Sequence, residues 1–214
     1  MNKENSIQAA RYLLEIKAVK LSPTEPFTWA SGRKSPIYCD NRLTLSYPQI
    51  RTFLREQFVS IIKANFNNFD VIAGVATGGI PQGALVAQEL NKPFVYVRSK
   101  AKDHGLGNQV EGKLESGQSV VVVEDLISTG KSSLQAVEAL RESGAIIKGM
   151  VAIFTYELDV AKDNFAKENV ELHTITNYST LIEAAVANKY VGSEDLNSLN
   201  KWRENPERWS DERI

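Results

Sequence analysis

Four consecutive valines, Val120–Val123, restrict the fold of this 214-residue chain more than any other feature. They are β-branched and apolar at successive positions, which is typical of a strand buried on both faces of a parallel sheet. Glu124 and Asp125 follow, then a turn of small residues at 128–130 and a helical pattern. Because open α/β sheets bind ligands at the carboxyl ends of their strands, we expect an α/β fold with a ligand-binding loop here.

The valines alone also fit a core strand that ends in a polar turn without function. The acidic pair favours a functional site, since Glu124 and Asp125 point to opposite sides of an extended backbone and are costly to bury without partners. The free N–H groups of the following helix favour a phosphate. Gly130-Lys131-Ser132 also resembles the end of a nucleotide-binding P-loop, but that motif needs a glycine where Asp125 stands.

Residues 122–130, Val-Val-Glu-Asp-Leu-Ile-Ser-Thr-Gly, resemble the motif with which type I phosphoribosyltransferases bind phosphoribosyl pyrophosphate (PRPP). The resemblance implies that the acidic pair binds the ribose hydroxyls, with Asp125 as a catalytic residue, and that the turn binds the 5′-phosphate. The residues that it implies for PRPP binding here are Glu124, Asp125, Leu126, Ile127, Ser128, Thr129, Gly130, Lys131 and Ser132.

Bulk composition sets the class of protein. Hydrophobic content of 43% and charged content of 24% are ordinary for one globular domain, which we expect to span residues 1–214. A net charge of −1 gives no basic excess, so no nucleic-acid partner is predicted. No apolar run approaches the ~20 residues of a membrane span. The single cysteine, Cys39, fits a reducing compartment, and we expect a cytoplasmic protein with no membrane partner.

Residues 27–42 are rich in aromatic, hydroxyl and basic side chains and lack a helical period, which predicts an irregular or short-stranded segment. The segment is similar to the N-terminal signature of orotate phosphoribosyltransferases, with Phe-Thr, Ser-Gly, then Ser-Pro and an aromatic residue. In that family it forms a hood over the base, here mainly residues 1–45. Some members contact orotate through a lysine where this chain has Ala30. The resemblance leaves Ser128, Arg42 or backbone groups as the orotate contacts.

Residues 70–81 repeat the order of strand, loop and helix. Ala76 to Gly79 are small enough to let the backbone approach a pyrophosphate closely, although an ordinary glycine turn would look the same. The resemblance implies that Thr77, Gly78 and Gly79 form the pyrophosphate loop. Some family members carry a lysine where Gly78 stands.

Residues 98–112 combine cations, a histidine and glycines without an apolar period. A solvated charged loop would look similar, but long polar loops in compact domains are often functional. Lys-Asp-His-Gly at 102–105 resembles the mobile catalytic loop of orotate phosphoribosyltransferases. The resemblance implies that Arg98, Lys102 and His104 bind PRPP, that Lys102 and His104 are also catalytic, and that two subunits of a homodimer share this loop.

Periodicity predicts the remaining elements. Ser6 is expected to cap a first helix, and further helices are expected at about 47–66 and 180–187. Further strands are expected at 94–97, 147–155 and 171–176. The C-terminal tail, residues 190–214, is expected to be helical and to dock through Trp202 and Trp209 onto the body or onto a partner subunit.

Together the motifs predict a single α/β domain with a central, mostly parallel sheet flanked by helices and a small N-terminal hood. The resemblance implies orotate phosphoribosyltransferase activity in pyrimidine synthesis, from orotate and PRPP. It implies Mg²⁺ as cofactor, held mainly through PRPP with Asp125 nearby. Two alternatives are a purine phosphoribosyltransferase, which needs a different base pocket, and a PRPP-sensing regulator, which needs a basic face or an added nucleic-acid module.

Overall fold

The computed structural model describes residues 2–29, 31–99 and 109–213. A six-stranded sheet in the order β10-β9-β8-β5-β6-β7 forms its centre. The only antiparallel pair described in this sheet is β6 with β7, so the predicted mostly parallel sheet is confirmed. The strands are β5 (Val71–Val75), β6 (Phe94–Val97), β7 (Val110–Glu111), β8 (Ser119–Ile127), β9 (Ile146–Thr155) and β10 (Leu172–Asn177).

The valine run lies in the middle of this sheet, where β8 pairs with β5 on one side and β9 on the other. All four valines are 0% exposed. Val121 and Val123 belong to the apolar core on one face of the sheet, whereas Val120 and Val122 belong to the core on the other. The prediction of a strand buried on both faces is therefore confirmed.

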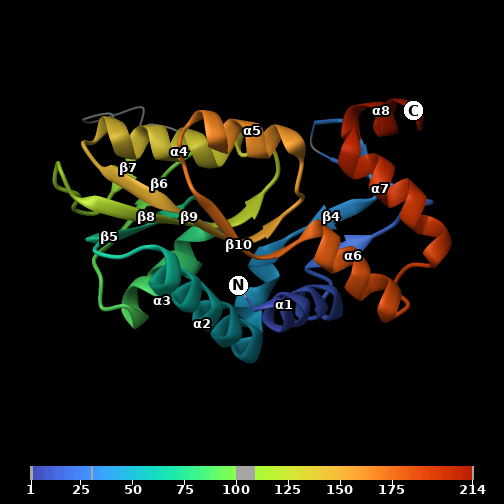
Figure 1. The fold of residues 1–214 in the computed structure, drawn as a ribbon, viewed down its shortest axis with the longest axis horizontal. Helices are drawn as coiled ribbons and strands as arrows, with labels where there is room; N and C mark the ends of the chain where they lie inside the picture. The colour runs from blue at the N-terminus through green and yellow to red at the C-terminus, as the bar shows by residue number, and fades with distance from the viewer. Residues whose placement is uncertain (1, 30, 100–108, 214) are drawn as a thin grey trace.

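Helices cover the two faces unequally (Figure 1). On one face lie α4 (Lys131–Glu142) and α5 (Asp159–Lys167). On the other lie α1 (Lys3–Glu15), α2 (Pro48–Asn65), α3 (Gly79–Glu89) and α6 (Tyr178–Ala187). Among the described residues, none of these helices is long and apolar enough to cross a membrane.

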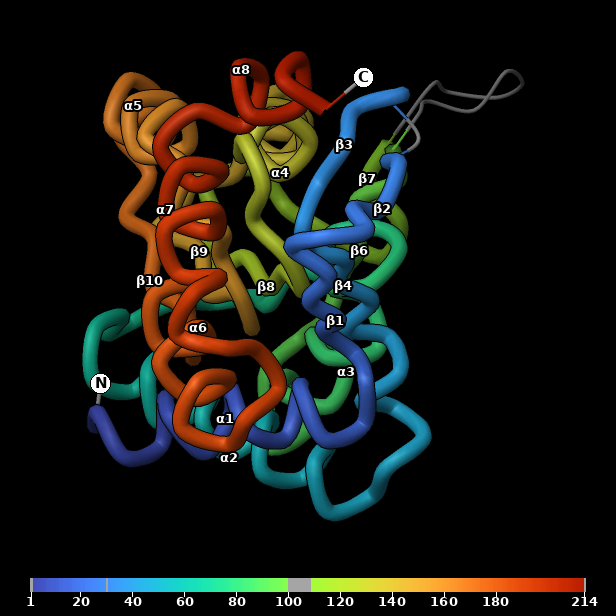
Figure 2. The backbone as a smooth tube through the Cα atoms, turned by 90° about the vertical axis from the view of Figure 1, so that its right-hand side faces the viewer, coloured from blue at the N-terminus to red at the C-terminus, as the bar shows by residue number. Residues whose placement is uncertain are grey.

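Two short ribbons form the predicted hood: β1 (Val19–Leu21) pairs with β4 (Ile37–Cys39), and β2 (Phe27–Thr28) pairs with β3 (Lys34–Ser35). The 3-10 turn η1 (Asn41–Ser46) leads from β4 towards the helices, and a second one, η2 (Ser193–Asp195), precedes the tail helices. The tail helices are α7 (Leu196–Glu204) and α8 (Pro206–Asp211), and α8 lies next to β3 (Figure 2).

The tail docks onto the body of its own chain, which is one of the two predicted alternatives. Trp202 and Trp209 are 0% and 2% exposed. Trp202 packs edge-on against Trp29 of the hood, and the backbone N–H of Lys34 in β3 donates to Ser210 Oγ of α8 at 2.9 Å. The hood therefore depends on the tail for part of its packing.

The predicted start of the first helix is wrong. Helix α1 begins at Lys3, and the side chain of Asn2 caps it by accepting from the N–H of Glu4. Ser6 lies inside the helix, is buried, and donates its hydroxyl to Thr176 Oγ1 in β10 at 3.2 Å. The hydroxyl was predicted to satisfy the backbone of its own helix, but it is used to join the helix to the sheet.

Candidate active site

A pocket of about 380 Å³ opens at the carboxyl ends of β5 and β8. Three segments that are distant in sequence form it: the end of the hood, the glycine loop after β5, and the acidic motif of β8 with its following turn. The structure thus brings together most of the predicted site residues. The lining residues are Cys39, Asp40, Arg42, Ala76, Thr77, Gly78, Glu124, Asp125, Leu126, Ser128, Thr129, Gly130 and Ser132.

The turn before α4 has the geometry of a phosphate site. Gly130 occupies the N-cap position with a φ of 77° and no side chain caps the helix; the N–H of Lys131 makes a long bond of 3.5 Å to Thr129 Oγ1, so a ligand can compete for the N–H groups of the first turn. A Cβ at Gly130 would lie 2.6 Å from the ring of Phe165, so only glycine fits. Asn164 Nδ2 holds the turn from α5 by donating to the carbonyl of Thr129 at 3.0 Å.

The two carboxylates of the motif have different surroundings. Glu124 is 5% exposed; it accepts from Ser133 Oγ at 3.0 Å and from the N–H of Asp125 at 2.9 Å. Burial, and then the neighbouring charge of Asp125, raise the pKa of Glu124 well above its ordinary value. Asp125 is only half-buried at the pocket wall. The expectation that at least one carboxylate faces the pocket is met by Asp125.

The glycine loop after β5 lies beside this pair. Thr77 and Gly78 line the pocket, whereas Gly79 is the first residue of α3. A Cβ at Gly79 would overlap with the carbonyl oxygen of Val123, so glycine is required for α3 to pack against β8. Close packing of the two elements keeps the predicted pyrophosphate loop next to the acidic pair.

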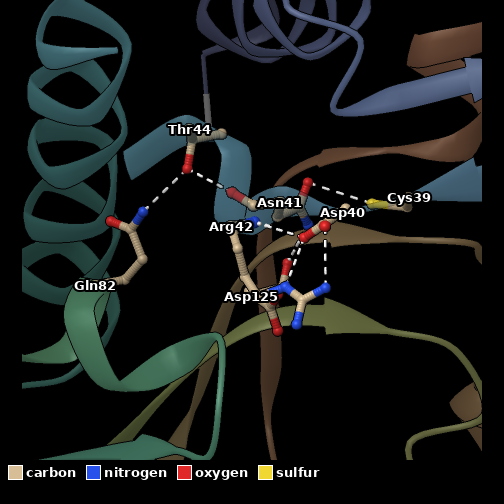
Figure 3. Close-up of polar contacts among 7 residues, drawn as sticks. All are labelled: Cys39, Asp40, Asn41, Arg42, Thr44, Gln82 and Asp125. Atoms are coloured by element: carbon tan, nitrogen blue, oxygen red, sulfur yellow. Dashed lines mark hydrogen bonds and ion pairs between the residues drawn. The ribbon is translucent and has the colours of Figure 1, made fainter. Parts of the chain in front are cut away.

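The hood contributes an ion pair to the opposite wall (Figure 3). Arg42 donates from Nε to Asp40 Oδ1 at 2.6 Å and from its terminal nitrogen to Asp40 Oδ2 at 2.9 Å. The hydrogen bond from Arg42 lowers the pKa of Asp40. Sequence reasoning named Arg42 but missed Asp40, whose only signal was a carboxylate two residues before that arginine.

Some predicted site residues lie outside the pocket. Ile127 is fully buried and Lys131 is exposed on α4, and neither lines the cavity. Arg98 follows β6, the strand beside β5, and its guanidinium lies 3.6 Å from Glu111 Oε1. Lys102 and His104 lie outside the described residues.

A second pocket of about 380 Å³ adjoins the first and shares Ser128 and Thr129 with it. The hood supplies Trp29, Arg33 and Lys34 to this pocket, and the tail supplies Arg203 among others. Sequence reasoning missed this wall, because no local pattern links residue 203 to the turn at 128.

The described residues contain no cluster of three or more His, Cys, Asp or Glu side chains that could hold a metal ion by itself. Asp125 nevertheless offers carboxylate oxygens at the pocket wall. A hard cation such as Mg²⁺ accepts oxygen ligands and often takes most of them from substrate phosphates and water. The donor set therefore fits a metal that arrives with its substrate.

Residues 47–189, which include the glycine loop and the acidic motif, match the phosphoribosyl transferase domain family. The chain is 59% identical over 202 residues to an orotate phosphoribosyltransferase of Listeria innocua, covering 94% of this chain and 97% of the relative. The chain belongs to the orotate phosphoribosyltransferase family. The predicted family and enzyme class, a transferase of pyrimidine biosynthesis, are thereby confirmed.

Solved structures of related proteins have the same fold as this orotate phosphoribosyltransferase family member. The crystal structure of orotate phosphoribosyltransferase from Aeropyrum pernix matches it with a TM-score of 0.74 at 30% identity, covering 86% of this chain and 99% of that one. Leishmania donovani UMP synthase matches with a TM-score of 0.78 at 25% identity, covering 92% of this chain and 42% of that one. The predicted fold class is therefore confirmed beyond the local motifs.

Proposed function

We propose that this chain transfers the 5-phosphoribosyl group of PRPP to orotate and releases orotidine 5′-monophosphate and pyrophosphate. The observation that carries the proposal is the single pocket in which a phosphate turn, an acidic pair and a glycine loop meet. Each matches one part of PRPP: the 5′-phosphate, the ribose hydroxyls and the pyrophosphate.

The reaction breaks the bond between C1′ of the ribose and the pyrophosphate oxygen, so positive charge develops on the ribose ring. Asp125, the more accessible acid, accepts from the ribose hydroxyls and stabilises this charge, with Glu124 behind it. Backbone N–H groups of 128–132 fix the 5′-phosphate. Thr77, Gly78 and Gly79 lie beside the leaving pyrophosphate. Electrostatic placement of this kind is commonly the largest contribution to catalysis.

Asp125 is also the residue that would hold Mg²⁺, because its carboxylate lies at the pocket wall against Gly78, between the proposed ribose and pyrophosphate sites. Bound there together with PRPP, the metal supplies positive charge to the pyrophosphate.

Arg98, Lys102 and His104 are proposed to bind the pyrophosphate and exclude water, which would otherwise hydrolyse PRPP. His104 has an imidazole suited to share a proton near neutral pH. The segment 98–112 is proposed to serve the neighbouring subunit of a homodimer. Mixing Lys102→Ala subunits with Asp125→Asn subunits tests this: shared sites restore part of the activity, whereas self-contained sites restore none.

Orotate is proposed to bind at Ser128, which together with Thr129 lines both pockets. Arg42 stands on the PRPP side and Arg203 on the tail side, and either guanidinium can bind the orotate carboxylate. Alanine substitution of each arginine separates these alternatives, because the true partner raises the KM for orotate with little change in the KM for PRPP.

The deciding experiment mixes the protein with orotate, PRPP and Mg²⁺ and follows the absorbance of orotate. Consumption of orotate supports the proposal. A purine phosphoribosyltransferase would consume adenine, guanine or hypoxanthine instead. A PRPP-sensing regulator would bind PRPP and leave orotate unchanged.

A further inference from the structure

A chain of buried polar side chains leads from the hood to the catalytic strand (Figure 3). Asn41 and Gln82 are 1% exposed and Thr44 is 0% exposed. Asn41 Nδ2 donates to the backbone carbonyl of Asp125 at 2.6 Å, and Thr44 Oγ1 donates to the carbonyl of Asn41 at 2.6 Å. Gln82 Nε2 in turn donates to Thr44 Oγ1 at 3.3 Å. This series of hydrogen bonds therefore connects η1, β8 and α3.

Every hydrogen bond in this network has a fixed direction. The Asp125 carbonyl can only accept, so the amide nitrogen of Asn41 must face it, and Asn41 Oδ1 is left to accept from Cys39 Sγ at 3.3 Å. The Thr44 hydroxyl has one hydrogen, which it gives to Asn41, so its oxygen accepts from Gln82. A carboxylate at position 41 would therefore remove the donor while keeping the shape of the side chain.

The network holds β8 on the edge where its pairing with β5 ends, while β9 stays paired with β8 on the other edge as far as Ile127. The pairing of β5 with β8 ends at Gly74 and Val123, two residues before Asp125. Beyond that point Asn41 is the partner of the Asp125 carbonyl. The neighbours of Asn41 in sequence, Asp40 and Arg42, both line the pocket, so one contact sets the position of the ribose-binding acid relative to the hood.

Gln82 extends the same connection to the pyrophosphate side. It lies in α3, three residues after Gly79, and does not line the pocket itself. Among the described residues its Oε1 atom is buried without a donor, a cost that an apolar side chain at this position would avoid. What Gln82 provides is its amide N–H to Thr44.

We propose that Asn41 is a positioning residue for PRPP, and that Thr44 and Gln82 hold it in place. The inference rests on the proposed role of this pocket in binding PRPP. Asn41 acts through Asp125: it fixes the backbone from which the carboxylate reaches the ribose. Misplacement of a reacting group by about 1 Å can cost on the order of 10²-fold in rate, so an anchor of this kind affects activity without touching substrate.

The test compares Asn41→Asp and Thr44→Val with the unsubstituted chain. Both replacements keep the side-chain shape, and Thr44 does not line the pocket. PRPP affinity is measured by calorimetry with Mg²⁺ and without orotate, and steady-state kinetics give the KM and kcat. For Asn41→Asp we expect kcat/KM for PRPP to fall by about tenfold or more. For Thr44→Val we expect a smaller loss in the same direction.

Asn65→Asp is the matched control. Asn65 Nδ2 also donates to a backbone carbonyl, that of Ile61 at 2.8 Å, but at the end of α2 and outside the pocket. We expect this variant to lose stability and to keep the PRPP affinity of the unsubstituted chain.

Normal PRPP affinity and kcat/KM in a folded Asn41→Asp variant would overturn the inference, even if the melting temperature falls. If Asn41→Asp does not fold, Thr44→Val decides, and unchanged PRPP affinity in that variant overturns the inference. Failure of the proposed function is distinguishable from both outcomes, because the unsubstituted chain would then leave orotate unconsumed.

Discussion

Asp125 and Gly78 face each other so closely that a Cβ atom at position 78 would overlap with the carboxylate of Asp125. The glycine at position 78 and the placement of the Asp125 carboxylate therefore depend on each other.

Gly78→Ala is expected to displace the Asp125 side chain and to weaken PRPP binding by about tenfold, the scale of one lost charge-assisted contact. Calorimetric titration with PRPP and Mg²⁺ measures the change. In an Asp125→Ala background the same substitution should cost much less, because the obstructed carboxylate is gone. Additive losses in the two backgrounds would show that Gly78 acts independently of Asp125.

Glu124→Gln is expected to change how stability depends on pH. Burial and Asp125 raise the folded-state pKa of Glu124 above its unfolded value of about 4.3. Such a group contributes stability below the unfolded pKa, and this contribution is lost as the pH rises through the folded pKa. The free energy of unfolding of Glu124→Gln, relative to that of the parent chain, should therefore increase as the pH rises above about 4.3.

Urea denaturation at a series of pH values measures this difference between Glu124→Gln and the parent chain. Glu25→Gln, at an exposed position, provides the control and should give a profile parallel to that of the parent. A parallel profile for Glu124→Gln as well would contradict the argument from burial.

Lys102→Ala is expected to lower kcat by on the order of 10²-fold or more, the scale of losing one key charge stabiliser. This prediction comes from the sequence, since Lys102 lies outside the described residues. Steady-state kinetics with saturating orotate and PRPP measure it. Lys113→Ala removes an exposed lysine that lies 2.8 Å from Glu115 and should leave kcat unchanged. Near-normal turnover in Lys102→Ala would refute its catalytic role.

Trp202→Ala is expected to destabilise the protein by about 3–5 kcal/mol, as large-to-small changes at buried tryptophans do. Trp202 is 0% exposed and contacts Trp29, Tyr156 and Tyr178. Tyr190→Ala, which truncates an aromatic side chain that is 50% exposed, should cost far less. Urea denaturation measures the loss of unfolding free energy in each variant. Equal losses would show that the tail does not stabilise the hood through Trp202.

Sequence reasoning predicted the parts of the site whose signal is local. Val120–Val123 made β8 recognisable as a buried strand, and the parallel sheet then placed the glycine loop after β5 beside the acidic motif. It did not predict that Asn41 holds Asp125 or that Trp202 supports Trp29, because such contacts join distant segments and leave no periodic pattern. Ser6 was misassigned for the same reason, since its partner Thr176 lies 170 residues away.

The bond between Lys34 and Ser210 spans 176 residues, nearly the whole chain. On the ribosome, the N-terminal ribbon is made long before α8, so the packing of Trp202 against Trp29 and the bond to Ser210 form only after α7 and α8 have been made. The wall of the second pocket is thus assembled later than the pocket at the acidic motif. A nascent chain acquires the sheet and the acidic motif first, and the second pocket only after the tail helices have been made.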